Sequence, residues 1–320
     1  MGIPAFNAEA TLADSIATVT SQSHQNLEIL IFDNGSTDGT AQICVDAKAK
    51  DPRISLLGSD ENMGLAHSFE RLLRAANGTY FMWAAADDFR PPDFVAEGVA
   101  HLEANPEASL SAPVAEGYVE GIEHPIYRAV TVGMEPGVST TKRLCRAMRS
   151  LPATAIYGVY RTEKAEETLG FRRSLATDLA FLFEIVLRGH VVSNPRQILV
   201  FNRRRRWNTL EEDYRTFTGR SGMPRFHLPF VQLYTDRARR ILHLDVGHLS
   251  RIWFVVLLSA LEIRRLVFMA AMRILNRVMT REAFSDVAVG LHCRFVHTAN
   301  YEILDHEVYR QRMIVARYQR

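Results

Sequence analysis

The sequence predicts an α/β fold with a mostly parallel sheet flanked by helices, followed by a helical C-terminal region. Short apolar runs alternate with segments of helical spacing over residues 2–85, which is the pattern of β-α-β units. The run LEILIF (27–32) is apolar throughout, as expected for a central strand that is covered on both faces. With 47% hydrophobic and 23% charged residues in a chain of 320, the composition is that of a globular protein with a substantial core.

The N-terminal elements follow one another in a regular order. In the first helix Leu12, Ile16 and Val19 have the spacing of a helix packed on a sheet, and Gly78 ends the third helix. The predicted elements are strand 2–6, helix 8–23, strand 27–32, helix 40–51, strand 54–59, helix 65–78 and strand 79–85.

The pattern changes in the second half of the chain. Residues 113–141 contain many glycines, prolines and isolated Val or Ile residues, and only short strands and loops are predicted there. A clear amphipathic helix runs over 176–189, and QILVFN (197–202) is the next strand. Beyond it the composition becomes Arg-rich and helical. We therefore predict two domains, 1–205 and 206–320.

Net charge is divided unevenly along the chain. Residues 203–320 carry 21 Arg, no Lys and 11 acidic residues, a net charge of +10, so the remainder carries −8 in a total of +2. A basic region of this kind can contact anionic lipid, an anionic acceptor or nucleic acid, or it can be a solvated structural surface. The composition leaves these alternatives open.

Cysteine usage and the N-terminal residues predict a cytoplasmic protein. The widely spaced Cys44, Cys145 and Cys293 form no CxxC or Cys/His ligand pattern, so reduced thiols are expected. The first residues lack the basic and long apolar regions of a secretory signal. No window reaches the roughly 18 consecutive apolar residues of a membrane-spanning helix.

Polar residues follow three of the predicted strands at their carboxyl ends, where open α/β sheets bind ligands. These segments are PAFNAE (4–9), DNGSTDGT (33–40) and AAADDFRPPDF (84–94). The chain has neither a Gly-Lys-Ser/Thr phosphate loop nor a GxGxxG turn after the first strand. Their absence argues against a P-loop nucleotidase and a standard dinucleotide dehydrogenase.

Two of these segments carry acids with a predicted chemical role. Asp33 directly ends a buried apolar run and can accept hydrogen bonds from a nucleobase or ribose, whereas Ser36, Thr37 and Asp38 suit a tight turn and the cap of the next helix. Asp87 and Asp88 are adjacent carboxylates, which repel each other unless a cation or hydrogen-bond donors offset their charge. A hard divalent ion, completed by substrate phosphates, would do so.

Several ordered segments resemble family 2 glycosyltransferases of the GT-A fold. The likeness runs from Gly2 to about Arg206 and implies a nucleoside-diphosphate sugar bound across the carboxyl edge of the sheet. It also implies a divalent metal (Mn²⁺ or Mg²⁺) and a glycan or lipid-linked acceptor, with no nucleic-acid partner. The segments are GIPAFNAEATLADSIATVTSQSHQNLEILIFDNGSTDGT, DENMGLAHSFERLL, GTYFMWAAADD and PDFV.

The resemblance implies roles for individual residues. Phe6 would lie against the base and Asp33 would bind its imino group. Asp87 and Asp88 would contact the ribose and the metal, and the resemblance does not indicate which acid does which. The full set implied for the nucleotide sugar is Pro4, Phe6, Asn7, Glu9, Asp33, Asn62 and Asp87, with Asp87 and Asp88 for the metal.

Two further segments match motifs of the family. The family places an acid as general base at the start of a later helix, and here Asp178 has that position, although an acid there can also simply cap the helix. NRRRRWNT (202–209) resembles the Arg-Trp motif of processive members. Arg203, Arg206 and Trp207 could contact the diphosphate or the acceptor, or they could belong to a solvated basic turn. Without a following membrane channel, the chain is not expected to be processive.

Two features depart from the family pattern. Ala85 stands where many relatives have an acid two residues before the Asp pair, so metal and ribose contacts would depend on Asp87 and Asp88 alone. The first strand is also shorter than is usual in the family. Either the start codon is misplaced, or this edge of the nucleotide site is weakened.

The longest apolar stretch in the C-terminal region, 252–272, is interrupted by charged residues, and 251–277 is predicted to form an amphipathic helix. Such a helix can lie on an anionic membrane or pack on its own domain. We hypothesise that it docks the enzyme at the inner face of a membrane, near a lipid-linked acceptor. The charged arc of the helical wheel holds Arg251, Glu262, Arg265, Arg273 and Arg277, and the apolar arc holds Trp253, Leu257, Leu261, Phe268 and Leu275.

The predicted function is metal-dependent, inverting transfer of a sugar from a nucleoside diphosphate to a hydroxyl acceptor such as a cell-envelope polysaccharide precursor. A nucleotidyltransferase is an alternative, but such enzymes usually begin with a Gly-rich basic phosphate loop, and PAFNAE is neither. A degenerate relative that binds a nucleotide sugar without turnover is a second alternative. Ala85 and the short first strand are compatible with it.

Overall fold

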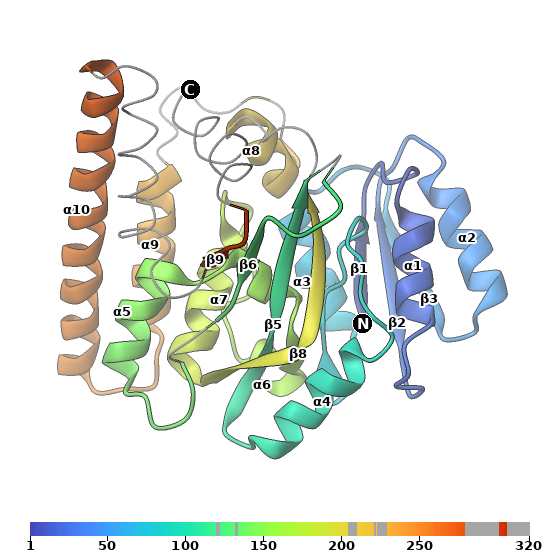
Figure 1. Ribbon diagram of the computed structural model, residues 1–320, viewed down its shortest axis with the longest axis horizontal. Helices are drawn as coiled ribbons and strands as arrows, with labels where there is room; N and C mark the ends of the chain where they lie inside the picture. Colours follow the sequence, from blue (N-terminus) through green and yellow to red (C-terminus); the bar gives the residue numbers. More distant parts are fainter. Residues whose placement is uncertain are drawn as a thin grey trace.

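The computed structural model describes residues 1–119, 122–131, 134–203, 210–220, 222, 229–278 and 301–305. Two β-sheets lie next to each other and are flanked by helices (Figure 1). The predicted α/β fold with a helical C-terminal region is therefore confirmed.

The first sheet has three parallel strands in the order β1-β2-β3. Strand β2 extends two residues beyond the predicted apolar run, so that Asp33 and Asn34 still pair with Gly58 and Ser59 of β3. The elements of this part are β1 (Gly2–Ala5), α1 (Leu12–Thr20), β2 (Ile29–Asn34), α2 (Thr40–Lys50), β3 (Ile54–Ser59) and α3 (Leu65–Ala75).

The predicted strand 79–85 is mostly wrong, because only Tyr80–Phe81 form a strand, β4. This strand pairs antiparallel with β7 (Val159–Arg161) of the second sheet. The chain then crosses to β1, where Gly2 N donates to Met82 O (2.8 Å) and Ala84 N donates to Gly2 O (2.8 Å). Pairing with one sheet and then with the other prevents a single regular strand.

The second sheet has the order β4-β7-β5-β6-β9, and β8 also pairs with β5, in parallel. The weak pattern over 113–141 predicted short strands, yet β5 is a twelve-residue strand because β8 pairs with it along most of its length. Helices α4 and α5 were not predicted. The remaining elements are α4 (Phe94–Ala104), β5 (Ala108–Val119), β6 (Tyr127–Ala129), α5 (Thr140–Ser150), a 3₁₀ turn (Ala153–Tyr157), α6 (Thr162–Glu166), α7 (Thr177–Arg188), β8 (His190–Arg203) and β9 (Tyr301–Ile303).

A buried aromatic cluster fixes the segment that leads to the acid pair. Trp83 is fully buried, and its ring lies within 5.3 Å, centre to centre, of the rings of Phe69, Phe81, Phe171 and Phe181. These rings come from α3, from β4, from the loop before α7 and from α7 itself. Packing of these rings around Trp83 holds four segments in place immediately before Asp87 in the sequence.

Three helices of the C-terminal region pack on the N-terminal part. Helix α8 (Leu210–Thr218) packs on α3, α9 (Pro229–Leu242) on α7, and α10 (His248–Val278) on α9 and α5 (Figure 1). Ile241 and Leu258 belong to the same hydrophobic cluster as Phe181 of α7. The helices after residue 206 therefore share a core with the preceding region, and the division at 205/206 stays a prediction.

The predicted charged face of α10 is partly wrong. Glu262 is only 5% exposed and accepts a hydrogen bond from Arg237 Nη1 (3.1 Å), so it faces α9 and not the solvent. Trp253, placed on the apolar arc with core-facing residues, is 53% exposed. Among the described residues, no helix is both long enough and apolar enough to span a bilayer.

Candidate functional site

A cavity of about 680 Å³ lies at the carboxyl ends of β1 and β2, and we call it the central cavity. Side chains from all three sequence-predicted strand ends, after β1, β2 and β4, meet there together with side chains of α3 and α8. Its lining residues are Pro4, Ala5, Phe6, Asn7, Ala8, Thr11, Asn34, Asn62, Leu65, Ser68, Phe69, Ala85, Ala86, Asp87, Tyr157, Arg215 and Thr216.

Hydrogen bonds to the loop after β2 fix the loop after β1. Asn7 has a left-handed backbone (φ 47°), and its Oδ1 accepts from Thr37 N (2.9 Å) while its N donates to Ser36 Oγ (3.0 Å). Glu9 Oε2 accepts from Gly39 N (3.1 Å) at the start of α2 and does not line the cavity. The strained turn leaves the Phe6 ring 42% exposed at the cavity wall, where a flat ligand could stack on it.

Residues at the end of β2 hold the loops next to the central cavity through hydrogen bonds. Asp33 is half-buried, its Oδ1 accepts from Ser36 N (3.1 Å), and it lies outside the cavity lining. Asn34 is 2% exposed and its Nδ2 donates to Asn62 Oδ1 (3.1 Å). The Asn62 oxygen also accepts from Gly64 N (2.8 Å), so these two amides set the shape of the loop before α3.

The predicted turn residues occupy the turn between β2 and α2. Asp38 Oδ1 accepts from Thr40 N (3.0 Å), the first residue of α2, and Asp38 Oδ2 accepts from Glu9 N (3.2 Å). Hydrogen bonds lower the pKa of Asp38. The bond with the Thr40 side chain contributes most, and the backbone N–H groups of Thr40 and Glu9 add to it. Its carboxylate stabilises the helix start, as an acid in this position should.

The two acids after β4 have different surroundings. Asp87 is exposed and lines the central cavity. Asp88 is 3% exposed and lies near Arg90, which is itself 1% exposed and whose Nη1 donates to Asp88 O (3.4 Å). Burial lowers the pKa of Arg90, and the charge of Asp88 is the largest effect opposing that shift. Asp87 therefore reaches the central cavity, whereas Asp88 is buried near Arg90.

Tyr157 connects the acid pair with Asp178. It lines the central cavity, and its pKa is raised well above the ordinary value, first by burial and then by the charges of Asp88, Asp87 and Asp178. Such interactions fall off with distance, so the three acids all lie in the neighbourhood of this one phenol. Asp178 itself is outside the cavity lining.

Asp178 is the second residue of α7, after Ala176 in a left-handed conformation (φ 57°). It is half-buried, and its Oδ1 accepts from Leu179 N (2.9 Å). The pKa of Asp178 is raised to about 6, chiefly by burial and to a smaller extent by the charge of Asp213, while the hydrogen bond from Leu179 N and the charge of Arg237 act in the opposite direction. A carboxyl group with this pKa is largely ionised at neutral pH but can still take up a proton, as a general base must.

Helix α8 closes the central cavity and was not part of the predicted site. Arg215 and Thr216 line the cavity, and the end of the helix lies directly against the loop before α3. A Cβ atom on Gly64 would collide with the backbone of Thr218, and one on Gly219 would collide with the carbonyl oxygen of Asn62. Two glycines therefore allow the close approach that positions Arg215.

The predicted basic contacts fall outside the side chains that the structure describes. Arg206 and Trp207 lie outside the described residues. Arg203 ends β8, and only its backbone is described.

The residues present fit a metal that is bound mainly by its substrate. Within the described ranges, no group of three or more His, Cys, Asp or Glu side chains could hold a metal ion. Asp87 offers one carboxylate at the cavity, and Mg²⁺ in nucleotide sites typically uses one or two carboxylates plus substrate phosphates. Asp87 would hold such an ion, whereas Asp88 is too buried to reach it without a rearrangement.

Of the residues predicted to contact the nucleotide sugar, the cavity brings together Pro4, Phe6, Asn7, Asn62 and Asp87, and it leaves out Glu9 and Asp33. Asn34, Tyr157 and Arg215 were not predicted. Asn34 lies in the polar segment DNGSTDGT (33–40), so its place in the site could have been predicted from the sequence. Tyr157 and Arg215 have no local signal, because distant segments bring them to the site.

The comparison with protein families identifies the class. The family model described as glycosyl transferase family 2 matches residues 1–177. The chain belongs to this family, whose activity is the transfer of a sugar.

The relatives are similar over a limited part of the chain. An uncharacterized glycosyltransferase of Haemophilus influenzae is 32% identical over 116 residues, which are 36% of this chain and 36% of that protein. The chondroitin synthase of Escherichia coli is 32% identical over 93 residues, 29% of this chain and 13% of that protein. The chain matches only about a third of the length of the first of these relatives.

Solved structures show the same fold. The crystal structure of S. aureus TarS 1-349 matches with a TM-score of 0.57 and 15% identity, over 91% of this chain and 77% of that one. Its complex with UDP-GlcNAc matches with a TM-score of 0.54 and 14% identity, over 99% of this chain and 90% of that one. At these identities the likeness establishes a shared GT-A fold and no more.

Proposed function

We propose that the protein transfers a sugar from a nucleoside diphosphate to a hydroxyl group of a polysaccharide or glycolipid precursor. The observation that carries this proposal is the central cavity, where Phe6, Asn34 and Asp87 come together at the carboxyl ends of the first two strands. Family membership supports the reaction class. The UDP-GlcNAc complex of TarS, which has the same fold, supports a nucleotide-sugar donor.

The donor is proposed to lie along the central cavity. Its base stacks on the exposed ring of Phe6, and the amide-ordered loop with Asn62 borders the ribose. Asp33 closes the turn after β2 by accepting a hydrogen bond from Ser36 N, and we place its carboxylate on the side of the base. Arg215 reaches the diphosphate from α8, because a guanidinium can form paired hydrogen bonds to phosphate oxygens.

A divalent ion, Mg²⁺ or Mn²⁺, would be held by Asp87 and would offset the negative charge of the departing diphosphate. Asp88 and Arg90 act indirectly: their buried charges hold the segment that presents Asp87. This proposal narrows the two sequence-predicted metal ligands to Asp87.

Asp178 is proposed as the general base of an inverting displacement. Its carboxylate takes the proton from the acceptor hydroxyl as that oxygen forms a bond to the anomeric carbon of the donor. The bond between the anomeric carbon and the diphosphate oxygen breaks in the same step, and the electron pair leaves with the nucleoside diphosphate. One displacement of this kind inverts the configuration at the carbon.

Donor binding and turnover test the proposal together. A thermal-shift panel of UDP-, GDP- and dTDP-sugars with Mg²⁺ should raise the Tm for at least one donor, because ligand binding stabilises the folded state. Asp178→Asn should keep this shift and reduce donor consumption by about 10²-fold or more. No shift with any donor would contradict the proposal. A shift with no turnover by the wild type would favour a non-catalytic relative that only binds the nucleotide sugar.

Contact with a membrane is a further part of the proposal. Helix α10 exposes an apolar stripe on the side away from its core contacts, and the C-terminal region as a whole is basic. The stripe would lie in the surface of an anionic membrane, at its inner face, close to a lipid-linked acceptor. It consists of Leu249, Ile252, Trp253, Val256, Ile263, Leu266 and Val267, which are 49% to 83% exposed.

A further inference from the structure

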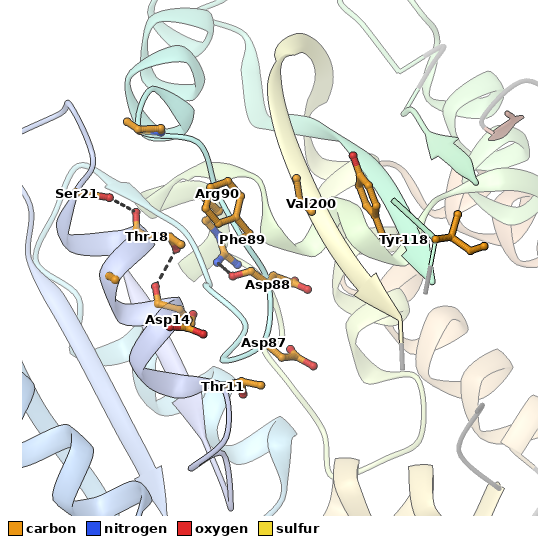
Figure 2. Close-up of a pocket in the computed structure, with 14 residues that line it drawn as sticks. Thr11, Asp14, Thr18, Ser21, Asp87, Asp88, Phe89, Arg90, Tyr118 and Val200 are labelled. Carbon is orange, nitrogen blue, oxygen red and sulfur yellow. Dashed lines mark hydrogen bonds between the residues drawn. The ribbon is translucent and has the colours of Figure 1, made fainter. Parts of the chain in front are cut away.

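A second cavity, of about 870 Å³, lies beside helix α1, and we call it the α1 cavity (Figure 2). Thr11 and Asp87 line both this cavity and the central cavity, so the two adjoin at these residues. One wall is the polar side of α1, with Thr11, Asp14, Thr18 and Ser21. The other carries Asp87, Asp88, Phe89, Arg90, Tyr118 and Val200.

The charges around the α1 cavity disfavour an anionic ligand. Among the lining residues that the structure describes, Asp14, Asp87 and Asp88 carry negative charge and Arg90 carries the one positive charge. Arg90 and Asp88 are both buried, so the accessible charge in this part of the lining is that of Asp14 and Asp87. Asp14 is exposed, and no hydrogen bond found within the described ranges uses its carboxylate. The described lining therefore disfavours a phosphate or carboxylate ligand, whereas a ligand rich in hydroxyl donors would find an acceptor in the exposed Asp14 carboxylate.

The wall opposite α1 has an aromatic surface. Phe89 is 53% exposed, although its backbone is held firmly: its N donates to Val200 O (3.2 Å) and its O accepts from Val200 N (3.1 Å). Tyr118, near the end of β5, is half-buried and also lines the cavity. Two aromatic rings in a lining that also holds carboxylates and hydroxyls suit a ligand with apolar faces and a polar edge, and a sugar ring has this form.

We propose that the α1 cavity binds a neutral sugar unit of the acceptor glycan, next to the unit that reacts. This inference rests on the proposed function and specifies its acceptor as an oligosaccharide. Because the two cavities adjoin at Asp87, a glycan in the α1 cavity ends beside the activated donor sugar. The reacting hydroxyl points toward Asp178, and the α1 cavity holds the flanking unit.

Ligand-observed NMR with the full chain in the presence of UDP and Mg²⁺ tests this inference. The probes are cellotetraose and chitotetraose, which are neutral, and tetragalacturonic acid, which is anionic. At least one neutral probe should bind and the anionic probe should not. Asp14→Ala and Phe89→Ala should each weaken the neutral complex at least fivefold. Asp46→Ala and Val45→Ala, matched changes on the exposed side of α2, should leave it unchanged.

Three outcomes would overturn the inference: binding of neither neutral probe, unchanged binding in both cavity variants, or preference for the anionic probe. Calorimetry of UDP, GDP and dTDP on the same samples separates this failure from that of the proposed function. Nucleotide binding without oligosaccharide binding would overturn the α1-cavity site alone. Absence of binding by all three nucleotides would contradict the proposed function itself.

Discussion

At the scale of single residues, Asp178 is a carboxyl group near the site whose pKa is shifted toward neutrality. Its pKa is raised to about 6, mainly by burial. Because only the carboxylate can accept a proton, kcat/KM should rise with pH through a midpoint near 6 and level off above 7. A pH–rate profile measures this rise in kcat/KM. A profile that stays flat between pH 5 and pH 7 would show that another group is the base.

The same pKa shift predicts a pH-dependent stability. The folded-state pKa lies above the ordinary 3.8, so the folded protein binds this proton more tightly than the unfolded chain. The corresponding stability is complete below about pH 4 and is lost as the pH rises through about 6. Asp178→Asn, which cannot ionise, should therefore have a higher Tm than the wild type at pH 8 and no such advantage at pH 4. Asp46→Asn, an exposed acid, is the control.

The acid pair gives a prediction that separates binding from stability. Asp87→Ala should weaken donor binding in the presence of Mg²⁺ about tenfold or more and leave the Tm nearly unchanged, because Asp87 is exposed. Asp88→Ala leaves the buried Arg90 without its main opposing charge and should cost about 3 kcal/mol of unfolding free energy.

Calorimetry and chemical denaturation check this pair of variants. EDTA should weaken donor binding by the wild type but not by Asp87→Ala. Equal effects of the two substitutions on the Tm would contradict the different roles assigned to Asp87 and Asp88.

At the scale of elements, the contact between α8 and the loop before α3 should control donor binding. Gly219→Ala places a Cβ against the Asn62 carbonyl at a left-handed position (φ 70°), so it should displace Arg215 and weaken donor binding. Gly137→Ala is a matched control, because Gly137 is also left-handed (φ 88°) but has open space around it. Both variants pay the backbone cost of about 1 kcal/mol. Calorimetry should find a loss of affinity in Gly219→Ala alone.

Helix α10 should determine membrane binding. In a flotation assay, the full chain should bind vesicles of anionic phospholipid at low salt, and Ile263→Glu should abolish the binding by placing a charge within the apolar stripe. Val45→Glu, at an equally exposed position on α2, should not. Binding that survives Ile263→Glu would show that α10 is not the contact.

At the scale of the whole molecule, a buried ion pair joins the C-terminal region to the helix that carries Asp178. Arg240 of α9 and Glu184 of α7 are both fully buried, and Arg240 Nη1 lies 2.5 Å from Glu184 Oε2. Arg240→Ala leaves the Glu184 charge without this partner and should cost about 3–5 kcal/mol. Arg239→Ala, at the exposed neighbouring position, should cost less than about 0.5 kcal/mol.

Urea denaturation measures both arginine variants. The wild type should unfold in one transition, because helices on either side of residue 206 share a core. Two separate transitions would instead support two independent domains, 1–205 and 206–320.

The sequence by itself determined the family, the order of the first elements and the polar strand ends. Local patterns carry this information, since the apolar run before Asp33 and the pair Asp87-Asp88 can be recognised without any distant contact. Strand β5 could not be predicted at its full length, because its pairing with β8 joins segments about 80 residues apart.

Only the tertiary structure decided which of the two acids faces the central cavity. Asp87 and Asp88 are equivalent in the sequence, but the chain buries one of them near Arg90 and leaves the other at the cavity. Tyr157 and Arg215 reach the central cavity from the 3₁₀ turn before β7 and from α8, and neither has a motif of its own. The physical reason is that burial and charge at a site depend on segments that meet only in the folded chain.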